Sequence, residues 1–338
     1  MNVPHLTPRR FGLWIGGLAL LLLTVCAGAP FIGPVSLDLA GLFAGTAPAD
    51  REIFFAVRLP RVLLAALVGG GLGLCGAVLQ AFLRNPLATP FTLGITGGSS
   101  FGAVLAIGLG LDFSLLGFTP VPVFAFTGAL VSVGLVFALS RAGGKAGAVT
   151  LLLAGVTINF FFSSLILLMQ YLAGTTHQSF QMVRWLMGGL DVVGFRVLLQ
   201  GLPFVVLGAV PLLYYARGYN LMTLGEEAAG GLGLDVERIK TVTFFATSLL
   251  VGVVTAMAGP ISFIGLITPH VLRLLIGSDH RLLLPGAFLA GGAFLVVCDT
   301  LARTVLGPVE LPVGIITALA GAPFFVWLLH RRAELSLS

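Results

Sequence analysis

The side chains of this sequence that could bind charged groups lie mainly at the borders of long apolar segments. Arg58-Leu59-Pro60-Arg61 directly precedes one such segment, and Arg303 lies near the end of another. Guanidinium groups bind carboxylates through paired hydrogen bonds, so these three arginines could dock acidic side chains of a partner protein. Snorkelling of the arginines to lipid headgroups explains the same pattern equally well.

Asp299 lies four positions before Arg303, a spacing that places both side chains on one face of a helix. An ion pair between them would neutralise two charges that are costly inside a membrane. A proton relay through Asp299 is the alternative, but no second acidic residue lies in the middle of an apolar segment. His270 and His280 lack a carboxylate or thiolate at ligand spacing, so we expect polar structural roles for them and not metal binding.

Motifs for nucleotide and redox chemistry are missing from the sequence. Gly143-Gly144-Lys145-Ala146 approaches a phosphate-binding loop but lacks the hydroxyl that binds magnesium. Cys26, Cys75 and Cys298 are scattered through apolar runs without CxxC spacing. We therefore expect no cofactor and no ATP hydrolysis in this chain, and we find no nucleophile, base and orienting residue that would indicate an enzyme.

The segments that carry these residues are strongly apolar. Of the 338 residues, 57% are hydrophobic and 9% are charged, against roughly a quarter charged in soluble domains. The net charge of +5 is spread along the chain, which disfavours nucleic-acid binding. Continuous apolar runs, without the alternating ten-residue pattern of a β-barrel, predict an all-α integral membrane protein.

Ten transmembrane helices are predicted. One window, 241–272, is broken at Ala258-Gly259-Pro260 and is divided into two helices, because glycine and proline end helices. The polar stretch 174–181 is expected to be a loop or surface helix, and the first apolar segment an uncleaved anchor. The windows without acidic or basic residues are 11–37, 62–83, 85–111, 113–140, 146–183, 197–216, 241–272, 282–298 and 311–330.

The distribution of basic residues predicts the orientation. With an even number of spans and the N-terminus inside, 12 of the 18 Lys and Arg residues fall on the cytoplasmic side, so both termini are expected to be cytoplasmic. Glycine accounts for 46 residues, and the pairs Gly12/Gly16 and Gly69/Gly73 and the series Gly94/Gly98/Gly102 predict close helix packing.

Two inner loops stand out. The segment from Arg84 to Pro90 contains two prolines four residues apart, which prevents a continuous helix and indicates a rigid turn or a constriction formed by Asn85 and Leu87. The longest cytoplasmic segment, 217–240, holds four of the 13 acidic residues and is broken by glycines. It is expected to form short helices that act as a connector or as a docking knob for a motor subunit.

Several motifs in one order resemble the permease family of type II ABC importers for iron chelates, haem and cobalamin. The resemblance covers nearly the whole chain. Its motifs are Arg58-Leu-Pro-Arg61, Arg84-Asn-Pro-Leu-Ala88, Leu93-Gly94, Leu151-Leu-Leu-Ala-Gly155, Arg184-Trp185, Leu224-Gly225-Glu226, Gly259-Pro-Ile, Phe263-Ile-Gly-Leu266, Pro269-His270, Asp279-His-Arg281, Asp299, Arg303, Glu310-Leu-Pro312 and Gly321-Ala-Pro323.

The resemblance implies one transmembrane permease domain over residues 1–338, with a coupling loop at 217–240. It implies a homodimer or a pair with a sister permease, two ATP-binding subunits that hold ATP and magnesium, and a periplasmic or lipid-anchored substrate-binding protein. By position, it assigns binding-protein docking to Arg58, Arg61 and Arg303, an inner gate to Asn85, Leu87, Ala148 and Val149, ATPase coupling to Gly225, Glu226, Glu227, Ala228 and Ala229, and the pathway lining to Asn159, Phe160 and Ser163.

The function expected from this resemblance is import of a large ferric siderophore across the bacterial inner membrane by alternating access. Haem or cobalamin on the same machinery is the alternative cargo. The stretch from Pro90 to Gly98, which is similar to iron-chelate members, favours the siderophore. A proton-driven secondary transporter is the rival from another class, and it would need an ionisable pair in mid-membrane.

Overall fold

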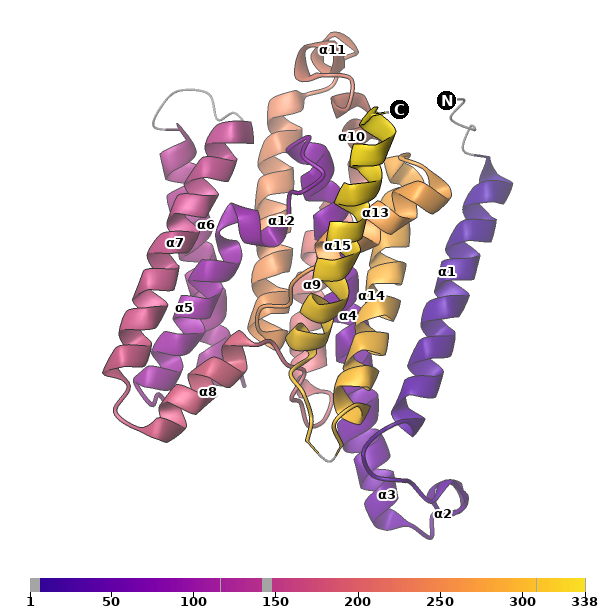
Figure 1. Ribbon diagram of the computed structural model, residues 1–338, viewed down its shortest axis with the longest axis vertical. Helices are drawn as coiled ribbons and strands as arrows, with labels where there is room; N and C mark the ends of the chain where they lie inside the picture. Colours follow the sequence, from indigo (N-terminus) through magenta and orange to yellow (C-terminus); the bar gives the residue numbers. More distant parts are fainter. Residues whose placement is uncertain (1–6, 116, 142–147, 308, 338) are drawn as a thin grey trace.

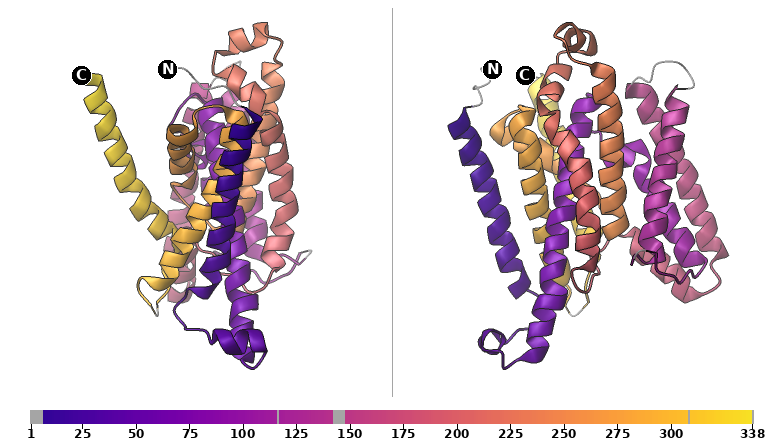
Figure 2. Two further views of the ribbon diagram at one scale, coloured as in Figure 1. Left: turned by 90° about the vertical axis from the view of Figure 1, so that its right-hand side faces the viewer. Right: turned by 180° about the vertical axis from the view of Figure 1, so that it is seen from behind.

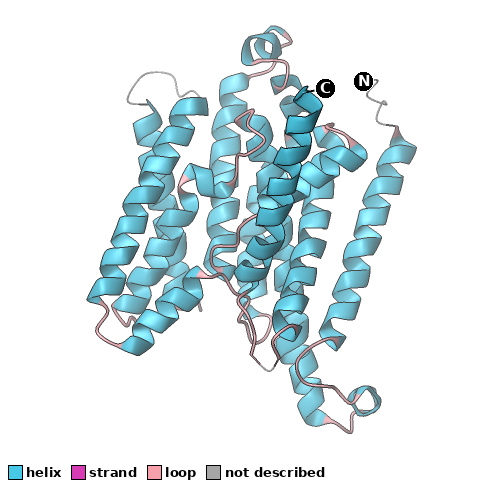
Figure 3. Cartoon of the chain, in the orientation of Figure 1, coloured by secondary structure: helices cyan, strands magenta, loops and turns pink. Residues whose placement is uncertain are grey.

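The protein is a bundle of helices that run roughly along one direction (Figures 1 and 3). The computed structural model describes residues 7–115, 117–141, 148–307 and 309–337. The helical elements, in chain order, are α1 (Pro8–Gly28), η1 (Ala29–Phe31), α2 (Leu39–Ala44), α3 (Pro48–Glu52), η2 (Ile53–Arg58), α4 (Leu59–Phe82), η3 (Pro90–Leu93), α5 (Ile95–Gly108), α6 (Pro120–Arg141), α7 (Ala148–Leu172), α8 (Thr176–Leu186), α9 (Arg196–Tyr214), α10 (Ala216–Met222), α11 (Glu226–Gly231), α12 (Val236–Ala258), α13 (Ile264–Ile276), α14 (His280–Thr304) and α15 (Val313–Leu337).

The predicted all-α membrane fold is confirmed. Within the described residues, 7 helices are long and apolar enough to cross a membrane, and three shorter apolar helices cover Ile95–Gly108, Ile264–Ile276 and Val313–Val326. These helices lie, in order, at the positions of the predicted spans, and the count of ten itself stays a prediction. The predicted break falls between α12 and α13, where Gly259 has a φ of 67°, and the polar stretch after α7 forms the separate helix α8.

One boundary differs from the prediction. The second apolar window was expected to begin after Arg61, but the helix continues unbroken from Pro48 to Phe82. Residues Ile53–Arg58 adopt π-helical hydrogen bonding directly before Pro60. Because proline lacks an N–H and clashes with the carbonyl four residues earlier in an α-helix, the wider π turn lets the helix pass this point. Arg58 and Arg61 therefore lie on one continuous helical segment.

Glycines bring the backbones of the central helices α4 and α14 together. A Cβ placed on Gly69 would lie 2.3 Å from the Gly291 carbonyl oxygen, and one on Gly73 would lie 2.3 Å from the Ala287 carbonyl oxygen. Gly98 and Gly102 of α5 approach α6 in the same way. The predicted close packing is confirmed for these glycines but is wrong for Gly12 and Gly16, where a Cβ would meet nothing within 4 Å.

Adding one methyl group at Gly76 is expected to destabilise the bundle. A Cβ there would lie 1.8 Å from the Gly265 carbonyl oxygen, so α4 and α13 must separate. We expect Gly76→Ala to cost about 1–3 kcal/mol, the usual penalty for overpacking a core, measured as reduced thermal stability of the purified protein in detergent. Gly12→Ala is the control, since its Cβ has free space. Equal stability of the two variants would contradict this packing.

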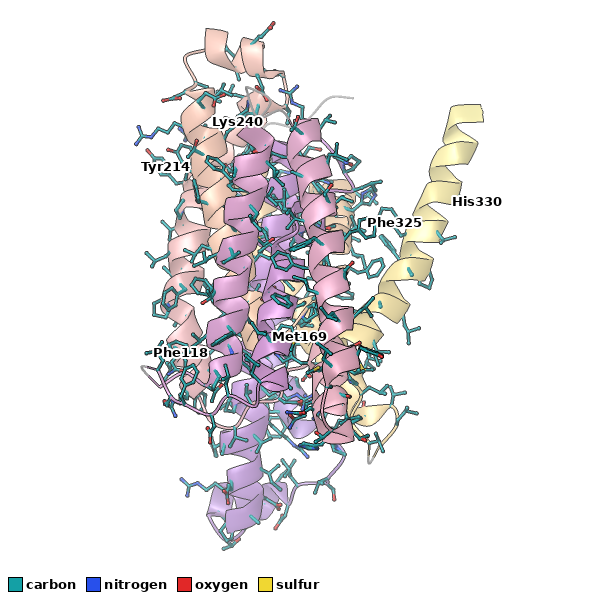
Figure 4. The ribbon with its side chains drawn as sticks, turned by 90° about the vertical axis from the view of Figure 1, so that its left-hand side faces the viewer. Phe118, Met169, Tyr214, Lys240, Phe325 and His330 are labelled. Carbon is teal, nitrogen blue, oxygen red and sulfur yellow. The ribbon has the colours of Figure 1, made fainter. Side chains whose placement is uncertain are left out.

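The two ends of the bundle carry different elements. The start of α1 and the end of α15 lie at the same end as α10 and α11, whereas α2, α3 and α8 lie at the opposite end (Figure 1). Lys240 marks the first end and Phe118 the second (Figure 4). We call them the α11 end and the α3 end. This arrangement agrees with the even number of spans expected from the sequence.

The last helix departs from the bundle. Figure 2 shows α15 leaning away from the other helices toward the α11 end, and Figure 4 shows Phe325 and His330 on this detached part. The base of α15 is held tightly, because a Cβ on Gly314 would lie 2.0 Å from the Met187 carbonyl oxygen and one on Gly321 would lie 2.2 Å from Cγ of Phe263. The helix is thus anchored at its base, while its later turns lean outward (Figure 2).

Candidate functional site

Four features carry the residues singled out from the sequence. They are a charge cluster at the α3 end, a knob at the α11 end, the turn after α4, and a groove beside α7.

The charge cluster is centred on Asp299. The Arg61 guanidinium donates to Asp299 Oδ1 through Nε at 3.0 Å, and its Nη2 lies 3.0 Å from the same oxygen. Nε of Arg303 lies 3.1 Å from Asp299 Oδ2, so the predicted i, i+4 pair is confirmed. Asp299 is fully buried between these two cations. This pairing accounts for a carboxylate that would otherwise be costly to bury.

Glu310 is a fourth member of the cluster. Nη1 of Arg61 lies 2.6 Å from Glu310 Oε2, and the Glu310 side chain is 38% exposed. A small pocket at this point is lined by Arg61, Arg184, Asp191 and Glu310 among others. Of the three predicted docking arginines, Arg61 lines this pocket. The Glu310 contact was missed from the sequence because 249 positions separate the two residues.

Arg58 and Arg303 hold the segment after α1. Nη1 of Arg58 donates to the Pro30 carbonyl oxygen at 3.2 Å, and Nη2 donates to that of Val35. Arg303 donates through Nη1 to the Ile32 carbonyl oxygen at 3.2 Å. Arg58, Arg61 and Arg303 are 4%, 6% and 2% exposed. Their role in docking stays a prediction, with the added condition that a partner must reach them through this packing.

The knob consists of α10, α11 and their turns, residues 216–235. Glu226 and Glu227 lie in the first turn of α11, where the helix dipole stabilises acidic side chains. Glu226 Oε2 accepts from Lys240 Nζ at 2.5 Å. Ala228 is exposed, but Ala229 is buried. Gly225 has a φ of 118°, which a residue with a side chain rarely adopts, so it makes the sharp turn into α11.

Side chains on α10 connect the knob to the bundle. Tyr219 is fully buried, and its hydroxyl lies 2.8 Å from Thr243 Oγ1 of α12. Asn220 donates to Asp279 Oδ1 at 2.8 Å and accepts from the His280 backbone N–H at 2.9 Å. The Asn220 amide oxygen also lies 2.7 Å from Nδ1 of His280. The sequence reasoning missed Asn220, whose partners lie about sixty residues away.

Removing the Asn220 amide is expected to loosen the knob. Asn220→Ala deletes three hydrogen bonds to the start of α14, and each contributes about 1 kcal/mol. We expect weaker coupling of ATP hydrolysis to transport, measured as solute moved per ATP in a reconstituted complex. Thr223→Ala is the control, because its hydroxyl bonds only the Asn220 carbonyl within its own turn. Unchanged coupling in Asn220→Ala would contradict the linkage.

The Asp279 carboxylate in this linkage is expected to stay ionised throughout the physiological pH range. Hydrogen bonds from Arg281, and then from Asn220, lower the pKa of Asp279 to about 2. A lowered pKa means that the stabilisation is present above the unfolded-state pKa of about 4 and is lost as the pH falls toward 2.

The turn after α4 carries the predicted inner gate. Asn85 Oδ1 accepts from the Leu87 backbone N–H at 2.9 Å, which stiffens the turn. Leu87 is 49% exposed and Val149, near the start of α7, is 78% exposed. Ala148 begins α7, and the phosphate-loop-like residues 143–146 lie outside the described part of the chain. The gate role of these residues stays a prediction.

The groove lies between α5 and α7. Two of the predicted pathway residues, Asn159 and Ser163, line it, whereas Phe160 on the same helix does not line it and is 72% exposed. The opposite wall includes Thr96, Gly97 and Ser100 of α5, and Pro260 and Ser262 of the turn between α12 and α13 close one end. The structure thus brings Asn159 and Ser163 to one site.

These features define a multi-span helical membrane protein with a protruding knob at one end. The sequence model of the protein family described as "FecCD transport family" matches residues 18–331. The chain belongs to this family. The hemin transport system permease protein HmuU of Yersinia pestis is 40% identical over 95% of this chain and 96% of its own length. The cobalamin import system permease protein BtuC of Halobacterium salinarum is 40% identical over 94% and 81%.

Two further proteins are similar. The iron(3+)-hydroxamate import system permease protein FhuG of Bacillus subtilis is 38% identical over 83% of this chain and 84% of its own length. A solved inward-facing structure of a metal-chelate type ABC transporter has a TM-score of 0.83 and 34% identity, covering 95% of this chain and 99% of that chain. The predicted family is confirmed: the chain is a permease subunit of an ABC importer, and ATP hydrolysis resides in partner subunits.

Proposed function

We propose that the protein imports a ferric siderophore across the bacterial inner membrane as one half of a permease pair, with both termini cytoplasmic. ATP-binding subunits would grip the knob at the α11 end, and a substrate-binding protein would dock on the charge cluster at the α3 end. ATP binding and hydrolysis would rock the helices so that one mouth opens while the other closes.

The main support for a permease pair is the exposed face of α7. Val149, Leu153, Phe160, Leu167 and Tyr171 are each at least 65% exposed along the length of this helix. Side chains on a helix that faces only lipid can be exposed in this way, but α7 also lines the groove, which carries polar side chains. A second permease facing this side, either a copy of this chain or a sister, would enclose a pathway.

The cargo cannot be chosen from sequence identity alone. Relatives named for hemin, cobalamin and ferric hydroxamate are 38–40% identical to this chain. The siderophore is preferred because the stretch from Pro90 to Gly98 is similar to iron-chelate permeases and because the groove walls are uncharged. Haem and cobalamin are the alternatives. A proton-driven mechanism is disfavoured, since the Asp299 carboxylate is held by two arginines.

The experiment that tests the cargo is retention by the cognate substrate-binding protein. The binding protein is purified and offered equal amounts of a ferric siderophore, haem and cobalamin, and the retained compound is identified by its absorbance spectrum. Uptake of that compound is then measured in vesicles that contain the permease and its ATP-binding subunits. Retention and uptake of the siderophore are expected. Retention of haem or cobalamin alone would overturn the proposed cargo.

A further inference from the structure

The groove between α5 and α7 has the composition of a small-molecule site. Its volume is about 420 Å³, within the usual range for ligand pockets. Its polar lining consists of Thr96, Ser100, Asn159, Ser163, Gln170 and Ser262, and the remaining lining residues are apolar. The groove is therefore an apolar recess with a few hydrogen-bonding groups, which is the arrangement that orients a bound molecule.

The polar groups on α7 are available to a ligand. Among the described residues, the side chains of Asn159, Ser163 and Gln170 form no hydrogen bond with protein atoms. Gly97 also contributes, because a Cβ there would lie 2.2 Å from Asn159 Oδ1. The missing side chain at Gly97 thus lets the Asn159 amide lie against α5.

The backbone at one end of the groove supports the same interpretation. The segment between α12 and α13 is not helical, and Phe263 has a φ of 68° although it is not glycine. Irregular backbone at membrane depth is tolerated only where protein or a water-filled cavity covers it. Pro260 and Ser262 of this segment line the groove. The groove is therefore expected to be covered by protein or water at this end, and not by lipid.

The charge of the lining indicates the class of ligand. None of the residues that line the groove is Asp, Glu, Lys, Arg or His, and none is Cys, Met or Tyr. The groove therefore has no cation to pair with a carboxylate of a ligand and no side chain that would coordinate an exposed metal ion. An isolated charge placed there would remain unpaired. Its hydroxyl and carboxamide groups suit amide and hydroxyl groups, which both donate and accept.

From these observations we infer that the groove is a cargo-binding subsite for an uncharged ferric chelate whose iron is already enclosed and whose edges carry amide or hydroxyl groups. This inference rests on the proposed import function and narrows its cargo. A compound with free carboxylates, such as haem, would be excluded by this subsite.

Opposite charges introduced at one position test the class of cargo. Gln170→Glu and Gln170→Lys are compared in vesicles with the ATP-binding subunits and the binding protein, with a neutral ferric trihydroxamate as the probe. For an uncharged cargo, both signs of charge are expected to reduce transport about equally, by roughly five- to tenfold, because each leaves a poorly solvated charge in the groove. A loss at least tenfold greater for one sign would show a charged cargo and overturn the inference.

Removal of a hydrogen-bonding group tests the groove itself. Asn159→Leu keeps the size of the side chain and should lower transport about fivefold, the effect of one hydrogen bond. Thr127→Val is the matched control, since Thr127 is an exposed residue of α6 outside the groove and its hydroxyl bonds only the Val123 carbonyl within its own helix. Co-purification of the ATP-binding subunits with both variants shows that the complex is assembled, and ATPase activity stimulated by the binding protein should stay unchanged in the control.

The outcomes separate the two proposals. If the wild-type complex moves neither the trihydroxamate nor any other ferric siderophore, the proposed function fails. If it moves the trihydroxamate but Asn159→Leu and both Gln170 variants match the Thr127→Val control, the subsite inference fails while the proposed function stands.

Discussion

Positive charge introduced into the exposed first turn of α11 is expected to uncouple ATP hydrolysis from transport. Glu227→Arg and Ala228→Arg change two exposed residues of the knob and leave buried Ala229 in place. A reversed charge in a protein interface costs about 2 kcal/mol or more, which corresponds to roughly thirtyfold in affinity. Transport per complex should therefore fall at least tenfold, measured in vesicles together with ATPase activity.

The control for this prediction is Asp112→Arg, which makes the same change of charge on an exposed residue beyond the end of α5, at the α3 end. Neither substitution removes the ion pair between Glu226 and Lys240. This ion pair should therefore still hold the knob in its fold in both variants. Wild-type coupling in both α11 variants, with the ATP-binding subunits still attached, would remove the knob from the mechanism.

Neutralising Glu310 is expected to strengthen binding of the substrate-binding protein. In the free permease, the Glu310 carboxylate forms an ion pair with Nη1 of Arg61. An acidic side chain of a docking partner must therefore compete with Glu310 for Arg61. Glu310→Gln should raise the affinity about fivefold, the effect of about 1 kcal/mol. Arg61→Gln should lower it at least tenfold. Both affinities are measured with the purified permease complex and the labelled binding protein.

Neutral substitutions are needed because the cluster is buried. Exchanging Arg58, Arg61 and Arg303 for glutamate would place new carboxylates beside Asp299 and Glu310, and an uncompensated buried charge costs about 3–5 kcal/mol. Arg61→Gln is milder, since Asp299 keeps its contact with Arg303. Thr304→Ala, which removes a hydroxyl bonded within its own helix, is the control. Unchanged affinity in both test variants would exclude Arg61 from docking.

Local features of the structure could be predicted from the sequence. The break at Gly259-Pro260 follows from the backbone preferences of two adjacent residues, and the Asp299–Arg303 pair follows from the period of one helix. The apolar windows gave the helices in order, because lipid leaves few ways to satisfy the backbone. The extension of α4 back to Pro48 was missed, since a π turn before proline has no clear signature in the residues.

Contacts between distant segments could not be predicted. Gly12/Gly16 and Gly69/Gly73 have the same spacing, yet Gly69 and Gly73 meet a neighbouring backbone and Gly12 does not. Which glycine faces a partner depends on how the helices are arranged. The same limit applies to Glu310 beside Arg61 and to Asn220 beside Asp279. The groove was partly anticipated through Asn159 and Ser163, but its second wall at Gly97 and Ser100 required the structure.

The most direct test of this account is solute accumulation by the purified protein in sealed vesicles. With ATP-binding subunits, the substrate-binding protein and ATP present, the vesicles are expected to concentrate the ferric siderophore above the outside level. Omitting the ATP-binding subunits should abolish accumulation. Uphill accumulation by this chain alone, driven by a proton gradient and without ATP, would contradict the account.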